Sequence, residues 1–429
     1  MLIAWDVVEE SLGEAEFLWN RREGALCSHD HDLTTLWDRI EDRLSGAIDG
    51  IRVGGDEAIR RYLSEALDAG RVASTAYAIG ADATPFARER LVAVWRDSDG
   101  DKLAALRRGA ELVDDPRLLP ALRLALADAR PAATAALLEA GRFRRLDPGA
   151  GVVDWLSHES AELQRAAVAA SRYAPHAIAR DCVRRAQLAE DPGVRTAAIE
   201  TGVFVGMREA WSACRSAVAA QADECRPLLT LVALLGSAAD HAAVVAAGAN
   251  EKLRRDAVWA IGFAGRRDGA DICIDLIRQN LLPKLAGEAF CAITGLDLQA
   301  AGLCAANDDN GDGEDDIVVP SPDEALPLPD LAGITAWWDG ARGRFDRQVR
   351  YLQGQAISPA ALQAALDRGP LRRRPPIATE LAIRSSGRYD VMTSAFIAEQ
   401  RRQLAAFPST LSSSGDPSRW SLDGWSPAP

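Results

Sequence analysis

The middle of this 429-residue chain repeats a helical pattern about every 30 residues, and this recurrence most constrains the fold. In the clearest copies, Val194 to Ile199 and Leu253 to Val258, an apolar residue precedes two or three polar or basic ones, then alanine and an aliphatic residue. Weaker copies begin near Val72, Leu103, Ala132, Leu163, Leu228 and Leu285. A unit of this length holds two short helices that bury their apolar faces only against neighbouring units. The spacing predicts an all-α solenoid of helical hairpins over residues 56–304.

The composition agrees with close-packed helices and excludes several partners. Aromatic residues make up only 6% of the chain, and the net charge of −13 repels phosphate, so we expect no nucleic-acid partner. The longest apolar stretch, Leu228 to Leu235, is far shorter than the roughly 20 residues of a spanning helix. The start has no basic region before Glu9 and Glu10. We therefore expect a cytoplasmic protein with no membrane partner.

Further segments flank the predicted solenoid. Residues 1–55 form an N-terminal helical hairpin in our prediction, because their apolar residues recur at spacings of three and four, with Asp32 as an N-cap. Residues 305–330 are acidic and proline-rich, which is typical of a linker. We predict a C-terminal helical module at 331–407, containing a helix that Ser358 caps, and a disordered tail at 408–429.

The sequence carries no motif that requires a cofactor, a metal or a catalytic group. The residues Asp308 to Gly313 match the opening of a calcium loop, but Val319 stands where a bidentate glutamate completes such a site. We interpret this segment as an acidic linker, and calcium binding by Asp308–Asp316 remains the alternative. No phosphate-binding loop, nucleophile elbow or zinc-protease motif is present, so we expect a protein that is not an enzyme.

Segments at both ends of the chain carry a family resemblance: near the N-terminus Glu14–Trp19, Asp38–Leu44 and Asp49–Ile51, and near the C-terminus Trp337–Trp338, Arg350–Gly354, Arg372–Arg374 and Glu380–Arg384. In these segments the chain resembles an uncharacterised proteobacterial family of HEAT-like repeat proteins associated with type VI secretion and polymorphic-toxin loci. The chain departs from the family at Ala47, where a histidine is common, and in its tail after Pro408. The resemblance implies a cytoplasmic accessory protein that binds a secreted toxin or effector, as an immunity protein or as a chaperone or adaptor.

We therefore expect a HEAT-like α-solenoid that binds another protein, and an acidic surface would suit a basic partner. If the second helix of each repeat lines the inner wall, the partner-binding residues are Arg180, Arg184, Arg208, Trp211, Arg215, Asp271, Asp275 and Arg278. The C-terminal module adds Trp338, Arg372, Arg373 and Arg374 as candidates. Two alternatives stay open: a base-excision glycosylase built on the same repeats, and a structural scaffold of the secretion apparatus.

Overall fold

The structure is a computed structural model, and it describes residues 5–55, 68–82, 84–127, 129–222, 225–305 and 321–407. These residues form an all-α fold that divides into two compact units. Unit 1 takes the residues up to 27, 31–205 and 392–403, and unit 2 takes 28–30, 206–391 and those from 404 onwards. The calcium-loop candidate Asp308–Asp316 and the tail 408–429 lie outside the described residues.

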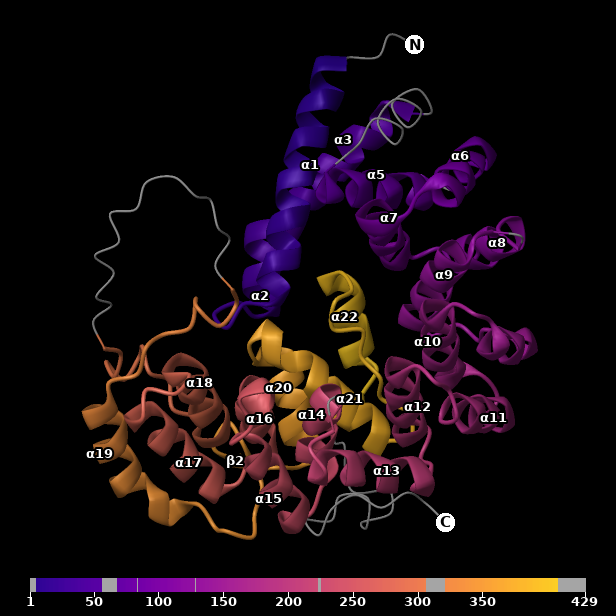
Figure 1. Cartoon of the computed structure of the whole chain (residues 1–429). Helices are drawn as coiled ribbons and strands as arrows, with labels where there is room; N and C mark the ends of the chain where they lie inside the picture. Colours follow the sequence, from indigo (N-terminus) through magenta and orange to yellow (C-terminus); the bar gives the residue numbers. More distant parts are fainter. Residues whose placement is uncertain are drawn as a thin grey trace. The chain divides into compact units, whose positions relative to one another are not determined.

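A row of helices, each packed on the next, forms the body of unit 1 and can be followed from indigo to magenta in Figure 1. We call these the row helices of unit 1: α1 (Trp5–Leu26), α5 (Ala69–Asp82), α7 (Gly100–Leu112), α9 (Pro131–Phe143), α10 (Ala161–Ala170) and α12 (Pro192–Phe204). Their contact faces carry many alanines, which allow close approach of neighbouring helices.

The remaining helices of unit 1 pack onto this row. Near the N-terminus these are α2 (Leu33–Leu36), the π-helix η1 (Trp37–Glu41) and α3 (Asp42–Val53). Further along they are α6 (Pro85–Asp97), α8 (Leu118–Ala125), the 3-10 helices η2 (Ala150–Ser157) and η3 (Ser171–Tyr173), and α11 (His176–Ala186). In Figure 1, α6, α8 and α11 lie on one side of the row and α22 (Ile397–Ala405) lies on the other.

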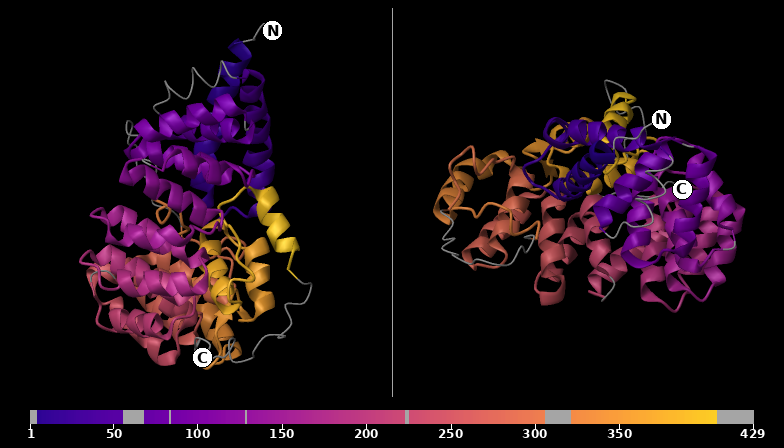
Figure 2. Two further views of the ribbon diagram at one scale, coloured as in Figure 1. Left: turned by 90° about the vertical axis from the view of Figure 1, so that its right-hand side faces the viewer. Right: turned by 90° about the horizontal axis from the view of Figure 1, so that it is seen from above.

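Unit 2 contains a second row, made of α14 (Arg226–Leu235), α16 (Glu251–Ala264) and α18 (Pro283–Thr294). The helices α13 (Arg208–Ala219), α15 (Ala238–Ala247) and α17 (Arg267–Arg278) pack against this row. Figure 2 shows these helices from two further directions, in magenta to orange. The alternation of row helices with partner helices within each unit is compatible with the predicted solenoid of hairpins.

The C-terminal part of unit 2 follows the row. It comprises α19 (Leu331–Ala341), η5 (Arg342–Arg344), the antiparallel pair β1 (Tyr351–Leu352) and β2 (Gln355–Ala356), α20 (Pro359–Arg368), η6 (Leu371–Arg373) and α21 (Arg374–Arg384). A buried ion cluster joins this part to the row. Glu380 accepts from Arg350 Nη1 and Arg384 Nε, both at 2.8 Å, and Arg350 also donates to main-chain carbonyls at the ends of α14 and α16. The row ends are thus fixed by charged hydrogen bonds.

Several sequence predictions are confirmed. The predicted N-caps Asp32 and Ser358 accept hydrogen bonds from the backbone N–H of Thr35 and Ala361. All eight repeat anchors lie in row helices, five in unit 1 and three in unit 2, and seven of them are buried.

The boundary between the units, at Val205 and Gly206, falls inside the stretch predicted as one solenoid. None of the helices in the described part of the chain is both long and apolar enough to cross a bilayer.

Candidate protein-binding surface

Residues 392–403, which we call the docked segment, lie against the row helices of unit 1, although even the last of these helices ends at Phe204. The chain folds this way because the row presents charged groups to main-chain atoms. Arg22 Nη2 donates to the carbonyl oxygens of Ser394 at 3.0 Å and Ala395 at 2.8 Å. Arg108 Nη2 donates to the same Ser394 oxygen at 2.7 Å. These contacts are made to main-chain oxygens, so they do not depend on which side chains Ser394 and Ala395 carry.

Glu41 binds a backbone donor of the docked segment, where the two arginines bind backbone acceptors. Its Oε2 accepts the backbone N–H of Ile397 at 2.7 Å, while its Oε1 accepts from Arg22 Nε at 2.8 Å. Arg22 and Glu41 are almost completely buried, so this pair works in a setting where unpaired charge is costly. Burial raises the pKa of Glu41, against the opposing effect of Arg22. The pair therefore forms a charged clamp with one donor arm and one acceptor arm for polypeptide backbone.

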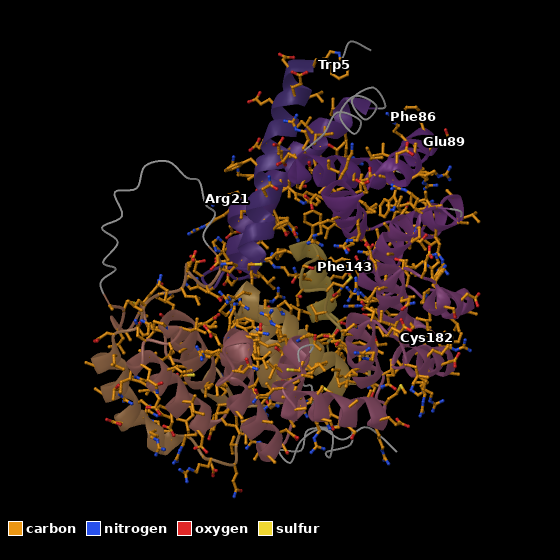
Figure 3. The ribbon with its side chains drawn as sticks, viewed as in Figure 1. Trp5, Arg21, Phe86, Glu89, Phe143 and Cys182 are labelled. Atoms are coloured by element: carbon orange, nitrogen blue, oxygen red, sulfur yellow. The ribbon has the colours of Figure 1, made fainter. Side chains whose placement is uncertain are left out.

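A second acidic residue balances the two arginines. Burial alone would raise the pKa of Glu23, but Arg108 and Arg22 together hold it below its ordinary value. Arg108 donates from Nε and Nη2 to the two Glu23 oxygens, at 3.0 and 3.1 Å, and from Nη1 to Glu111 at 3.2 Å. The Arg108 guanidinium also lies 5.6 Å from the centre of the Phe143 ring, a residue labelled in Figure 3. These contacts fix the guanidinium that meets the Ser394 carbonyl.

Side chains of the docked segment add an apolar anchor. The Phe396 ring meets Trp19 edge-on at 6.2 Å and Tyr77 at 5.0 Å between ring centres. The Arg22 guanidinium lies 4.8 Å from the centre of the Phe396 ring, which favours the cation over the aromatic face. Ile397 is completely buried. Backbone hydrogen bonds and one aromatic–aliphatic anchor together hold the segment, as in many peptide-recognition surfaces.

A charged patch continues along the row beyond the docked segment. It consists of Arg107, Glu139, Arg142, Arg172 and Glu200, contributed by α7, α9, η3 and α12. Arg107 forms ion pairs with Glu139 and with Glu111. Burial lowers the pKa of Arg142, and the neighbouring Arg172 lowers it further. Burial raises the pKa of Glu200, against the opposing effects of Arg142 and Arg172. The patch is half-buried, so its members still reach solvent.

The predicted partner-binding residues occupy other places. Arg180 and Arg184 lie on α11, on the opposite side of the row from the docked segment, and Arg184 is exposed. In unit 2, Arg208, Trp211 and Arg215 lie on α13, where Trp211 is buried and the other two are exposed.

Most of the other predicted residues have intramolecular partners. Asp275 and Arg278 form an exposed ion pair on α17. Asp271 accepts from the buried Trp338 indole N–H at 2.7 Å and from Arg342. Arg372 is buried against Glu288, Asp323 and the Trp259 ring. Arg374 is completely buried and donates to the Leu366 carbonyl, and Arg373 is buried beside a cavity of unit 2. The predicted cluster of three arginines therefore belongs to the interior.

Three residues that bind the backbone of the docked segment were not among the predicted partner-binding residues: Arg22, Glu41 and Arg108. One signal for them exists in the sequence. Arg22 follows Trp19 by three positions and so continues the apolar stripe of α1, where a charged residue needs a buried partner. Glu41 similarly follows Trp37 by four positions, on the next apolar stripe. No signal marks residues 392–403 as their ligand.

In comparisons with known proteins, no family model matches the chain, and no curated protein shows significant similarity to it.

Proposed function

We propose that the chain is a non-enzymatic protein-binding scaffold and that the row helices of unit 1 form its binding surface. The observation that supports this is the docked segment itself. The row helices α1 and α7 bind its Ser394 and Ala395 carbonyls, and Glu41 on the adjoining η1 binds its Ile397 N–H. Backbone groups are common to all polypeptides, so a surface built in this way suits an extended segment of a partner. The adjoining charged patch supplies the side-chain selectivity.

The family resemblance extends this proposal to a partner. The protein acts in the cytoplasm, where it binds a toxin or effector of a type VI secretion or polymorphic-toxin system, as an immunity protein or as an effector chaperone or adaptor. The net charge of −13 favours a basic partner, because complementary charge accelerates the encounter. The charged patch, which contains both signs, would set the register of that partner on the row.

The test uses the full chain as bait in the native cell, followed by mass spectrometry of the captured proteins. Arg142→Gln combined with Arg172→Gln changes the patch, and Arg184→Gln on the exposed face of α11 is the matched control. Circular dichroism checks that all variants keep their helices. We expect one protein to be enriched by the native chain and by the control, and at least tenfold less by the double variant.

Two results would contradict the proposal. A captured protein that is lost with Arg184→Gln but retained by the patch variant would move the binding surface to the other side of the row. Salt-sensitive binding of duplex DNA in a gel-shift assay, with no captured protein, would favour the glycosylase alternative.

A further inference from the structure

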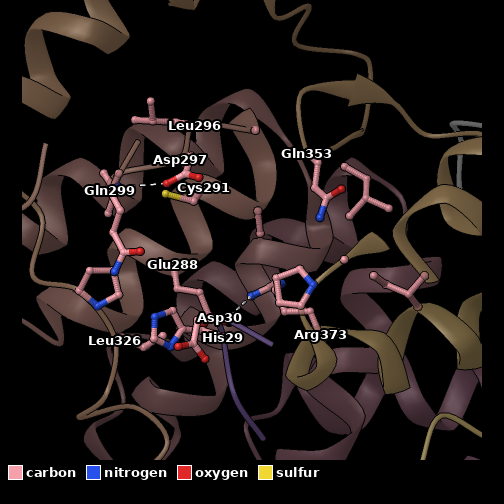
Figure 4. A pocket seen from close by; sticks show the side chains of 18 residues that line it. His29, Asp30, Glu288, Cys291, Leu296, Asp297, Gln299, Leu326, Gln353 and Arg373 are labelled. Carbon is pink, nitrogen blue, oxygen red and sulfur yellow. Dashed lines mark hydrogen bonds and ion pairs between the residues drawn. The ribbon is translucent and has the colours of Figure 1, made fainter. Parts of the chain in front are cut away.

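Unit 2 contains a cavity of about 510 Å³, a size typical of small-molecule sites. Its wall is built by α18, the loop that follows it, the η6 region, and residues 29–30 and 326–327 (Figure 4). It lies entirely within unit 2 and shares no residue with the docked segment or the charged patch of unit 1.

The cavity wall holds a buried cation with unused donors. Arg373 is 5% exposed, and its Nε, Nη1 and Nη2 atoms all lack a hydrogen-bond acceptor in the described part of the chain. Its guanidinium lies against the rings of Phe263, at 4.0 Å, and Trp259, at 4.7 Å. These rings favour the positive charge but accept no in-plane hydrogen bond. Buried donors are almost always satisfied in native proteins, so an unsatisfied fork of this kind indicates a missing acceptor.

Glu288 stands beside this cation with unused acceptors. Its Oε1 is 3.8 Å from Arg373 Nη1, which is beyond hydrogen-bond distance, and 3.2 Å from Arg372 Nε, an ion pair without hydrogen-bond geometry. Neither Glu288 oxygen accepts a hydrogen bond from any described residue. A donor fork and a carboxylate that both lack hydrogen-bond partners among the described residues lie side by side on one wall. They match a ligand group that carries an acceptor and a donor two or three bonds apart.

The wall also carries two aspartates among mostly apolar residues. Asp30 and Asp297 line the cavity together with Glu288 and Arg373. Asp297 uses Oδ1 to accept the backbone N–H groups of Gln299 and Ala300, both at 3.0 Å, which fixes the carboxylate in the wall. Because Glu288 also pairs with Arg372, the charge argument depends on Asp30 and Asp297, which favour a ligand whose remaining part is positively charged.

We propose that this cavity binds a free basic α-amino acid. The ligand's α-carboxylate takes the Arg373 fork, its α-ammonium takes Glu288, and its cationic side chain lies toward Asp30 and Asp297. Arg373 and Glu288 are binding residues in this proposal and perform no chemical step. The site would make unit 2 responsive to a small molecule, in addition to the protein-binding surface proposed for unit 1.

The test is isothermal titration calorimetry of the full chain with defined probes. L-arginine and L-lysine carry the whole recognition pattern; agmatine lacks the carboxylate, L-glutamate reverses the side-chain charge, and inorganic phosphate is a plain anion. We expect the two basic amino acids to bind with dissociation constants below about 1 mM, and each of the other probes to bind at least tenfold more weakly.

Variants separate the site from general charge effects. Glu288→Gln keeps the shape of the side chain, and Arg373→Lys keeps its charge but removes the fork. Asp275→Asn, on the exposed face of α17 in the same unit, is the matched control. We expect at least a tenfold loss of L-arginine affinity in the first two variants and no change in the control.

Three outcomes would overturn the proposal. They are equal binding of agmatine and L-arginine, phosphate as the tightest ligand, and no binding of either basic amino acid to the native chain at 10 mM (about 2.7 kcal/mol of affinity). Because these titrations use the native chain, they decide the matter even where Arg373→Lys fails to fold. If neither basic amino acid binds, a crystal structure of the native chain would show only ordered water on Arg373 and Glu288.

Discussion

Replacing Glu380 with alanine tests the buried cluster that joins the C-terminal part of unit 2 to its row. Glu380 is 1% exposed and faces two guanidinium groups, Arg350 and Arg384, which are 3% and 4% exposed. Burial alone would raise the pKa of Glu380, but Arg350 and Arg384 together lower it, so the carboxylate is ionised in the folded chain. Its removal leaves two like charges in the interior, beside the main-chain carbonyls of Leu234 and Phe263.

The magnitude follows from that geometry. Glu380 accepts three hydrogen bonds, from Arg350 Nη1 and Nη2 and from Arg384 Nε, at 2.8, 3.3 and 2.8 Å. Breaking a buried ion pair by removing one partner costs about 3–5 kcal/mol, because the other charge stays buried without compensation. We expect Glu380→Ala to lower the free energy of unfolding of unit 2 by that amount. Asp275→Asn, which breaks an exposed ion pair with Arg278, should cost less than about 1 kcal/mol.

The assay is urea unfolding combined with hydrogen exchange and mass spectrometry. Peptides from α14, α16 and α21 report on the elements that the cluster joins, so their exchange rates should rise together in Glu380→Ala. The double variant Glu380→Ala with Arg350→Met should recover part of the loss, because it also removes a stranded charge. A cost below about 1 kcal/mol, or one equal to that of Asp275→Asn, would refute the argument from buried charge.

Three further predictions concern single residues. Burial, reinforced by Arg350 and Arg266, lowers the pKa of His241 to about 3. The folded chain thus keeps this ring neutral while the unfolded chain protonates it below pH 6.5. Stability should therefore fall by about 1.4 kcal/mol per pH unit from about pH 6 to pH 3, less steeply in His241→Gln, and an equal slope in both chains by urea titration would contradict this. Burial raises the pKa of the Cys182 thiol to about 11, so iodoacetamide should label exposed Cys304 and leave Cys182 unlabelled at pH 8; mass spectrometry showing equal labelling would oppose it. Asp191→Ala removes the N-cap bond to Val194 N–H and should cost about 1 kcal/mol in thermal unfolding, with no effect expected from exposed Glu190→Ala.

Much of the local structure was predictable because it depends on residues close in sequence. The 30-residue recurrence predicted a helix at each anchor, and a row helix lies at every one, from Val72 in α5 to Leu285 in α18. Capping residues such as Asp32 and Ser358 fixed helix starts by hydrogen bonds that span three positions. The division at Val205 was not predictable from periodicity, because the repeat continues on both sides of it and the units differ in long-range packing.

The proposed binding surface was not predictable for a related reason. The helix pairs of a repeat look alike in sequence, so the choice of the second helix as the inner wall was a convention, and it selected α11 residues such as Arg184. In the structure, Arg22 and Arg108 lie on row helices, and the Ser394 carbonyl that both bind is 372 and 286 positions away in sequence. Likewise, Arg372, Arg373 and Arg374 were candidates for partner binding, whereas all three are buried. Contacts of this sequence separation leave no local pattern.

The path of the chain has a consequence for biosynthesis. Unit 1 is completed only by residues 392–403, after the whole of 206–391 has been made. A nascent chain that has emerged from the ribosome through Val205 therefore holds Arg22 and Glu41 without the carbonyls and the N–H group that they bind in the finished protein. The first half must wait in an incomplete state during the synthesis of the second, and messages truncated before residue 392 would yield a product with a stranded clamp and a short lifetime in the cell.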